Sequence, residues 1–180
     1  MNRISEINSR EDIDQNYLHT PIGLLLEYHN LSKPLDKHTE AKILIGMCID
    51  NRKHLNLPDN FAYIIRSGGA NLKYNDFHIS YAIAVGNIKH IALIAHNKCG
   101  MVNLKDRKDN FISGLENNAG VNKNWAEEHF IQFEPTFEIE NEIDFIISET
   151  NRLRLVYPKI TIAPMFYNVD NQRLFLVNEN

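Results

Sequence analysis

The chain has 180 residues, 43% of them apolar, and a formal charge of -4 at neutral pH. This length and apolar content suit one compact domain with its own core and exclude a disordered chain. The acidic balance argues against a nucleic-acid-binding protein, which usually carries a basic patch. The polar stretch 1–16 has no signal-peptide core, and the longest apolar runs are too short to span a bilayer. We therefore expect a cytoplasmic protein with no membrane or nucleic-acid partner.

The first part of the chain predicts a helical arm that leads into a sheet. Residues 1–40 form the arm, with a helix over 21–31 that begins at Pro21 after the N-cap residue Thr20. Residues 41–180 form the remaining domain. Short runs that are apolar on both faces predict buried strands of a parallel sheet. These runs cover residues 41–48, 61–65 and 90–95.

Helices are expected between these strands and after them. Residues 75–85 place apolar side chains at helical spacing, and core packing is the expectation for Phe77 and Tyr81. Residues 111–132 are weakly patterned but mostly helical, and 139–155 predicts a clear amphipathic helix. The last two strands, at 160–167 and 173–177, predict a hairpin at one sheet edge. The fold class is therefore α/β, a single domain with a mostly parallel central sheet of about five strands flanked by helices.

Three potential metal ligands follow two of the predicted strands. Cys48 ends the first strand, and His96 and Cys99 follow the third. Ligands sit at the carboxyl ends of the strands in an open α/β sheet, so the three converge if those strands are neighbours. Two thiols and an imidazole favour zinc, and three protein ligands leave a fourth position for water, as in catalytic sites. In the alternative arrangement, Asp50 is the fourth ligand and closes the site until it moves.

Asp50 and Arg52 are expected to support this metal centre. Their i, i+2 spacing in a chain that leaves a strand points both side chains the same way. Arg52 can clamp the Asp50 carboxylate, which then orients a metal-bound hydroxide by accepting its proton in a hydrogen bond. After the second strand, Gly68 and Gly69 can bring backbone N–H groups close to a substrate. These four residues are the predicted catalytic and substrate-binding positions.

Together these motifs resemble the β-carbonic anhydrase family. The pattern Cys-x-Asp-x-Arg stands at 48–52, and His-x-x-Cys-Gly stands at 96–100. The segment 66–70 is similar to the Arg-Asn-Ala-Gly segment of the family, and 167–174 is similar to its closing Tyr-Asp-x-x-x-Gly-Arg-Leu. The resemblance covers 41–177, and the short chain with His-x-x-Cys-Gly-Met looks most like the compact archaeal and bacterial branch.

The resemblance implies a carbonate dehydratase, a zinc lyase that interconverts CO2 and bicarbonate with one Zn2+ per subunit. Cys48, His96 and Cys99 would be its ligands, and Asp50 with Arg52 its catalytic pair. Gly69 would lie beside the substrate. The resemblance also implies a homodimer or larger homo-oligomer with the active site near a subunit interface.

Some positions depart from the family pattern and leave other functions open. Ser67 and Ala70 replace residues of the substrate loop, Asn97 follows the histidine ligand, and 105–135 match no part of the pattern. The changed loop is compatible with hydrolysis of carbonyl sulfide or carbon disulfide at the same site. A third interpretation is a non-catalytic zinc protein that senses bicarbonate. The intact Asp50–Arg52 pair argues against it, because a purely structural zinc needs no such pair.

Overall fold

Six strands form one mixed sheet in the computed structural model, which describes residues 3–179. The strands are β1 (Ile4–Ser5), β2 (Ile43–Met47), β3 (Ala62–Arg66), β4 (His90–His96), β5 (Thr161–Asn168) and β6 (Arg173–Val177). Their order across the sheet is β1-β6-β5-β4-β2-β3. The four strands from β3 to β5 run parallel, and β6 and β1 add antiparallel pairs at the other edge. The predicted mostly parallel α/β sheet with a terminal hairpin is confirmed, and β1 is a sixth strand too short to show a pattern.

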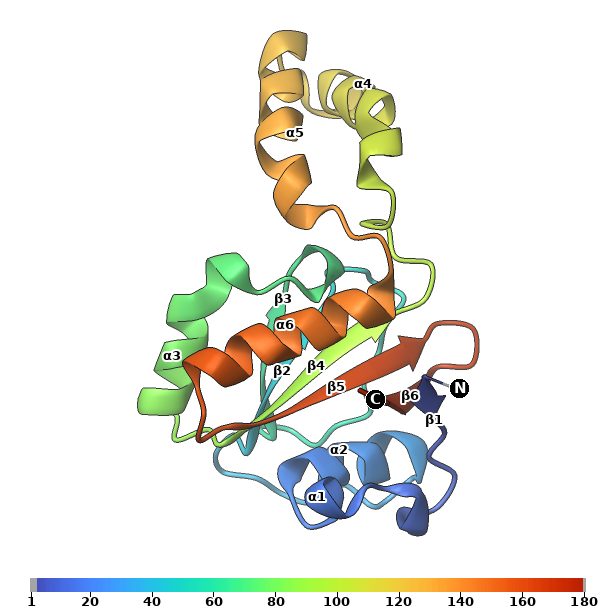
Figure 1. Ribbon diagram of the computed structural model, residues 1–180, viewed down its shortest axis with the longest axis vertical. Coiled ribbons are helices and arrows are strands. Elements are labelled where there is room, and N and C mark those ends of the chain that lie inside the picture. Colours follow the sequence, from blue (N-terminus) through green and yellow to red (C-terminus); the bar gives the residue numbers. More distant parts are fainter. Residues whose placement is uncertain (1–2, 180) are drawn as a thin grey trace.

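The helices cover both faces of this sheet, and two of them extend beyond the carboxyl ends of its parallel strands (Figure 1). They are α1 (Gln15–Leu18), α2 (Pro21–Asn30), α3 (Asp76–Ala84), α4 (Lys108–Ala119), α5 (Lys123–Phe137) and α6 (Glu142–Val156). Short 3-10 turns lie at Arg10–Asp12, Gly68–Ala70, Lys73–Asn75 and Leu104–Arg107. Figure 1 shows α4 and α5 as an antiparallel pair that projects from the body of the domain.

The alternation of side chains along the buried strands divides the core into two layers. On β2, Ile43, Ile45 and Met47 pack in the layer that contains α2, whereas Leu44 packs in the layer with α3 and α6. Both faces are covered, so all five residues of β2 are buried. This two-sided burial explains why the strand reads as a continuous apolar run. It also fixes the register, because a shift by one residue would exchange the two layers.

Parts of the arm predicted at 1–40 pack against the rest of the chain. Strand β1 pairs with β6, and Ile22, Leu25 and Leu26 of α2 lie fully buried in the core. Thr20 caps α2 by accepting a hydrogen bond from the Ile22 N–H, as its position before Pro21 predicts. The division of the chain at residue 40 stays a prediction. Within residues 3–179, no helix combines the length and the apolarity needed to cross a membrane.

Two helices differ in detail from the sequence-based expectation. The segment 111–132 belongs to two helices, because Gly120 adopts a left-handed conformation (φ 67°) that ends α4. In α3 the buried residues are Ile79 and Ala82, whereas Phe77 is 79% exposed and Tyr81 52% exposed. The expectation of core packing for Phe77 and Tyr81 is therefore wrong, because the face of α3 that carries them is open to solvent.

The second core layer encloses a buried carboxylate that secures α6 to the loop before α3. Glu149 is 3% exposed, and it accepts hydrogen bonds from the Leu72 N–H (3.0 Å) and from Arg152 Nε (2.8 Å). Arg152 also reaches Asp76 at the start of α3, at 3.1 Å. The guanidinium therefore neutralises the charge that this contact buries.

Replacing Arg152 with Met should lower the free energy of unfolding by about 3 kcal/mol, because Glu149 would keep its charge in a buried place without a partner. Urea unfolding followed by circular dichroism measures this loss. The double variant Glu149→Gln/Arg152→Met should recover more than half of it, since the new amide is uncharged and its oxygen can still accept from the Leu72 N–H. Arg107→Met, on an exposed residue, is the control. An Arg152→Met variant as stable as that control would contradict the prediction.

Candidate metal centre

The potential ligands Cys48, His96 and Cys99 meet at the carboxyl edge of the sheet. Strands β2 and β4 are parallel neighbours, with Met47 opposite Ile94, so the residues that follow them emerge side by side. The ligand atoms of the three residues all lie within 4.8 Å of one another. Each residue is at most 4% exposed. The condition set by the sequence, that these two strands be adjacent, is therefore met.

The protonation of this cluster fits a bound cation. The nearby Cys99 thiol, and less strongly the nearby His96 imidazole, lower the pKa of Cys48. In turn, the Cys48 thiolate raises the pKa of Cys99, because a second negative charge so close to the first is unfavourable. Two adjacent thiolates need a compensating positive charge, and a divalent metal supplies it. Both cysteines are free thiols, so the ligand set is available.

The imidazole of His96 is also oriented as a ligand. Its Nδ1 lies 2.9 Å from the Asn97 carbonyl oxygen, to which the neutral ring can donate its proton. This tautomer leaves Nε2 as the acceptor, and Nε2 is buried without a hydrogen-bond partner. A buried polar atom without a partner is costly, and a metal ion at Nε2 removes that cost. The donor set and the free Nε2 together fit zinc.

The loops that carry the ligands are held from outside the cluster. The Asn97 side chain accepts from the Val169 N–H (2.7 Å) and donates to Asp170 (2.9 Å), which joins the β4 end to the β5–β6 turn. Lys98 has a left-handed backbone (φ 57°) and an ion pair with Asp170. Glu142 at the start of α6 accepts from the Cys99 N–H at 3.3 Å. Asn97 and Lys98, which depart from the family pattern, thus make contacts of their own here.

Asp50 and Arg52 form a close ion pair beside the cluster. Arg52 Nη2 lies 2.6 Å from Asp50 Oδ2, and Arg52 Nε lies 2.9 Å from Oδ1. Nη2 also donates to the Lys98 carbonyl, which ties the pair to the loop of Cys99. Hydrogen bonds from the Arg52 side chain hold the pKa of Asp50 well below its usual range. Asp50 thus stays ionised at neutral pH. The stability that this pair adds is present above the unfolded-state pKa and is lost only as pH falls through the lower folded-state pKa.

The carboxylate of Asp50 is engaged by Arg52 and does not belong to the ligand cluster. Within residues 3–179, the group whose ligand atoms lie within 4.8 Å of one another contains only Cys48, His96 and Cys99. In this arrangement the protein offers three ligands. A fourth position is then open to a small molecule, which is the arrangement of catalytic zinc sites.

Two residues near the site carry signals that the sequence does not reveal. Arg66 on β3 donates to the carbonyl oxygens of Cys48, Asp50 and Lys53, and so shapes the whole loop after β2. Lys53 is 3% exposed, and its Nζ has no hydrogen-bond partner. Burial lowers the pKa of Lys53, while the nearby Cys48, Asp50 and Cys99 raise it. Its burial has no signature in a local pattern, because a lysine five residues after a ligand normally reads as surface.

Gly68 and Gly69 lie on the side of the centre that faces α5. Gly69 has a left-handed backbone (φ 64°), which favours glycine. A Cβ on Gly68 would lie 3.0 Å from Met101 Sδ and 3.2 Å from the Phe137 ring, so a side chain at this position has almost no room. Met101 itself packs against the cluster formed by Cys48, Cys99 and Ile139. The two glycines therefore allow Met101 and α5 to approach the centre closely.

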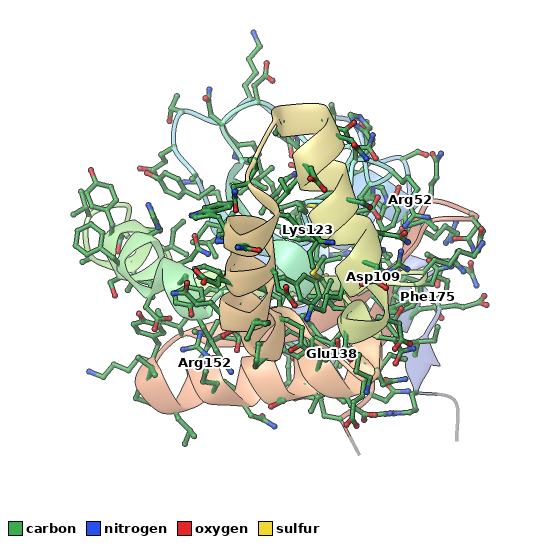
Figure 2. All side chains as sticks on the ribbon, turned by 90° about the horizontal axis from the view of Figure 1, so that it is seen from above. Arg52, Asp109, Lys123, Glu138, Arg152 and Phe175 are labelled. Atoms are coloured by element: carbon green, nitrogen blue, oxygen red, sulfur yellow. The ribbon has the colours of Figure 1, made fainter. Side chains whose placement is uncertain are left out.

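A pocket of about 360 Å³ opens between this edge of the sheet and the α4–α5 pair. Ile49, Gly68 and Met101 line it from the side of the metal centre, and side chains of α4 and α5 line it from the other side. Seen from above, α4 and α5 lie over the body of the domain, and Arg52 is visible outside their outline (Figure 2). The residues at 105–135, which match no part of the family pattern, thus form much of the wall of a pocket next to the centre.

Comparison with known proteins places this fold among the β-carbonic anhydrases. By sequence, no protein-family model and no curated protein matches the chain. By structure, it is similar to β-carbonic anhydrase isoform I from Trichomonas vaginalis, with a TM-score of 0.63, 18% identity, and coverage of 93% of this chain and 100% of that chain. It is also similar to a carbonic anhydrase from Streptococcus mutans, with a TM-score of 0.60, 19% identity, and coverage of 87% and 95%. The apo form of a carbon disulfide hydrolase matches with a TM-score of 0.56, 19% identity, and coverage of 77% and 79%. The predicted resemblance is confirmed at the level of the fold, whereas the archaeal and bacterial branch stays a prediction.

We expect the purified protein to bind one zinc ion per chain and to lose this ability when a ligand is removed. His96→Ala should weaken zinc binding by more than about 100-fold, since even residues outside the ligand set commonly contribute 10–100-fold. Elemental analysis after dialysis against a chelator, with competition titration for affinity, measures the effect. His78→Ala removes an exposed histidine and is the matched control. Equal zinc contents in the two variants would contradict the site.

Proposed function

We propose that this protein is a zinc-dependent carbonic anhydrase that interconverts CO2 and bicarbonate. The observation that supports it most is one arrangement: a Cys48–His96–Cys99 cluster with a partnerless His96 Nε2, adjacent to an ionised Asp50 clamped by Arg52. A structural zinc site would be closed by a fourth protein ligand and would not need this pair. The fold shared with β-carbonic anhydrases supports the same assignment.

The reaction adds water to CO2 and yields bicarbonate and a proton. Zinc, when bound, supplies the Lewis acidity that lowers the pKa of water toward neutrality. The ionised Asp50 accepts a hydrogen bond from the attacking oxygen and so directs a lone pair of that oxygen toward the CO2 carbon. Arg52 keeps the Asp50 carboxylate charged and fixed in place, because it binds both of its oxygens. The released proton passes to buffer.

The two thiolate ligands affect the pH at which this chemistry should run. They cancel the formal charge of the metal, so the site is expected to be a weaker Lewis acid than one with three histidines. We therefore expect the rate to rise toward alkaline pH. Asp50 does not account for that rise, because its pKa lies below its usual range.

Stopped-flow measurement of CO2 hydration at alkaline pH tests the proposal, with Cys48→Ser as the metal-site blank. Wild-type protein should exceed the blank by orders of magnitude. Asp50→Asn should lower kcat by about 100-fold with zinc content unchanged, since Asn cannot supply the charge. Asp59→Asn, on an exposed aspartate, should leave the rate unchanged. Wild-type protein that holds zinc but does no better than the blank would refute the assignment and favour a non-catalytic, bicarbonate-sensing protein.

Hydrolysis of carbonyl sulfide or carbon disulfide is the second candidate. It would use the same cluster and the same Asp50–Arg52 pair, since these substrates are also linear and have an electrophilic central carbon. The apolar pocket beside the centre favours it, and one of the similar structures is a carbon disulfide hydrolase. Release of sulfide from either compound distinguishes this activity from CO2 hydration.

Association into a homodimer or a larger homo-oligomer is part of the proposal. Phe77, Tyr81 and Val85 lie four residues apart on one face of α3 and its C-cap, and all are more than half exposed. Tyr63 on the edge strand β3 is adjacent, because a Cβ on Gly86 would lie 2.8 Å from its ring. Exposed apolar surface of this kind beside an unpaired sheet edge is typical of a protein interface.

A cytoplasmic location is also part of the proposal, because thiols that bind a metal must stay reduced.

Phe77→Asp combined with Tyr81→Asp should convert the assembly to a monomer, because two charges would have to be buried in the interface. Size-exclusion chromatography with light scattering measures the mass. Ile131→Asp places a charge on another exposed apolar residue, on α5, and should leave the assembly intact. An unchanged oligomer in the double variant would place the interface elsewhere.

A further inference from the structure

The α4–α5 pair borders a largely apolar pocket, and four phenylalanines are among the residues that line it. The rings of Phe111 and Phe130 lie 5.2 Å apart, and the His129 ring lies 4.8 Å from that of Phe133. The first contact joins α4 to α5, the second lies within α5, and all four side chains also line the pocket. The pocket volume, about 360 Å³, falls at the lower end of the range of about 300–1,000 Å³ that is usual for small-molecule sites. The space is therefore large enough for a small molecule and poorly suited to a charged one.

The pocket shares a wall with the metal centre. Met101 lines the pocket and also packs against the cluster of Cys48, Cys99 and Ile139. Ile49, the residue after Cys48, lines the pocket as well. The Met101 side chain therefore separates the pocket from the metal centre. Because methionine is unbranched and flexible, this side chain can change its rotamer with little cost.

Glu134 is the one acidic side chain of the pocket lining, and no cation in the part of the chain that the structure describes forms an ion pair with it. Its side chain is half-buried, and across residues 3–179 the structure shows no ion pair or hydrogen bond for its carboxylate. Other glutamates nearby differ in this respect: Glu138 accepts from the Lys105 N–H, and Glu127 pairs with Lys108. An unpaired carboxylate in a partly desolvated pocket repels anions more strongly than one in open water.

We propose that the pocket between α4 and α5 is the access site for the neutral, apolar substrate of the proposed reaction, and that Glu134 excludes anions from it. This inference rests on the proposed function. Its substrates are uncharged linear molecules, and an apolar pocket concentrates them in proportion to their apolar character. The product is an anion, and it is repelled on this side. Arg52 and Lys98, both exposed, lie on the loops outside the α4–α5 pair, and each forms an ion pair with an aspartate there.

Dissolved xenon probes the pocket without any catalysis. In metal-free wild-type protein, xenon should shift the NMR signals of the residues that line the pocket. Leu104→Trp, at a lining position, fills the space and should abolish these shifts. Ile131→Trp adds the same bulk to an exposed site on α5 and should leave them unchanged. No xenon-dependent shift in the wild-type pocket, or shifts that persist in Leu104→Trp, would overturn the proposal.

Kinetics of the zinc-loaded enzyme test both the access role of the pocket and the charge of Glu134. Leu104→Trp should raise KM for CO2 several-fold with little change in kcat, since access and not chemistry is affected. Glu134→Lys should lower the inhibition constant of thiocyanate at least 5-fold, and Glu134→Gln should give a smaller decrease. Glu128→Lys makes the same charge change at an exposed position of α5 and should have no such effect. Equal inhibition constants in Glu134→Lys and Glu128→Lys would overturn the role of Glu134. Xenon in the pocket of a protein that hydrates neither CO2 nor its sulfur analogues would overturn the proposed function instead, and with it the identity of the ligand.

Discussion

The pairing of β2 with β4 is the constraint on which the rest of the site depends. Because these strands are parallel neighbours in a fixed register, the chain after Met47 and the chain after Ala95 reach the same point. Two thiols and an imidazole are thereby confined within 4.8 Å in a buried place. There the two thiols shift each other's pKa in opposite directions, since the pKa of Cys48 is lowered and that of Cys99 is raised. When both cysteines are thiolates, the two negative charges that the sheet brings together are balanced by a divalent cation.

Keeping the ligand loops in place requires side chains that bond to backbone, because loops at a sheet edge cannot satisfy their own carbonyl groups. Arg66 reaches the carbonyls of the loop after β2, and Asn97 joins the loop after β4 to the β5–β6 turn. Arg52 adds a link between the two loops through the Lys98 carbonyl. The proposed catalytic pair of Asp50 and Arg52 therefore also makes a structural contact, and the effect of its removal should be judged together with zinc content.

The Cys48–His96–Cys99 cluster could be predicted from the sequence because parallel strands buried on both faces are easy to recognise as continuous apolar runs. The runs before Cys48 and His96 are apolar with little interruption, so their ends, and the ligands just after them, can be located to within a residue. Motif spacing then singled out Asp50 and Arg52. The residue roles assigned from those motifs stay predictions, whereas the fold and the adjacency of the two strands are observed.

Other features leave no comparable trace in a sequence. The period of α3 is the same whether its apolar face meets the core or solvent, so the pattern alone cannot place Phe77 and Tyr81 on the correct side. A strand of two residues, such as β1, has no period at all. The burial of Lys53 follows from the path of a loop held by Arg66, a residue of a different strand. Such features depend on tertiary contacts, and only the folded chain contains them.

The centre has two chemically different sides, and this difference follows from where the chain places its charges. Toward α5 the surroundings are Gly68, Met101 and phenylalanine rings, with Glu134 as the acidic group. Toward the β5–β6 turn they are Arg52, Lys98 and their acidic partners. A reaction that joins a neutral apolar molecule to water and yields an anion needs both kinds of surroundings. The short loop after β4 contributes to both sides. Lys98, just before Cys99, pairs with Asp170 on the charged side, and Met101, just after it, lines the apolar pocket.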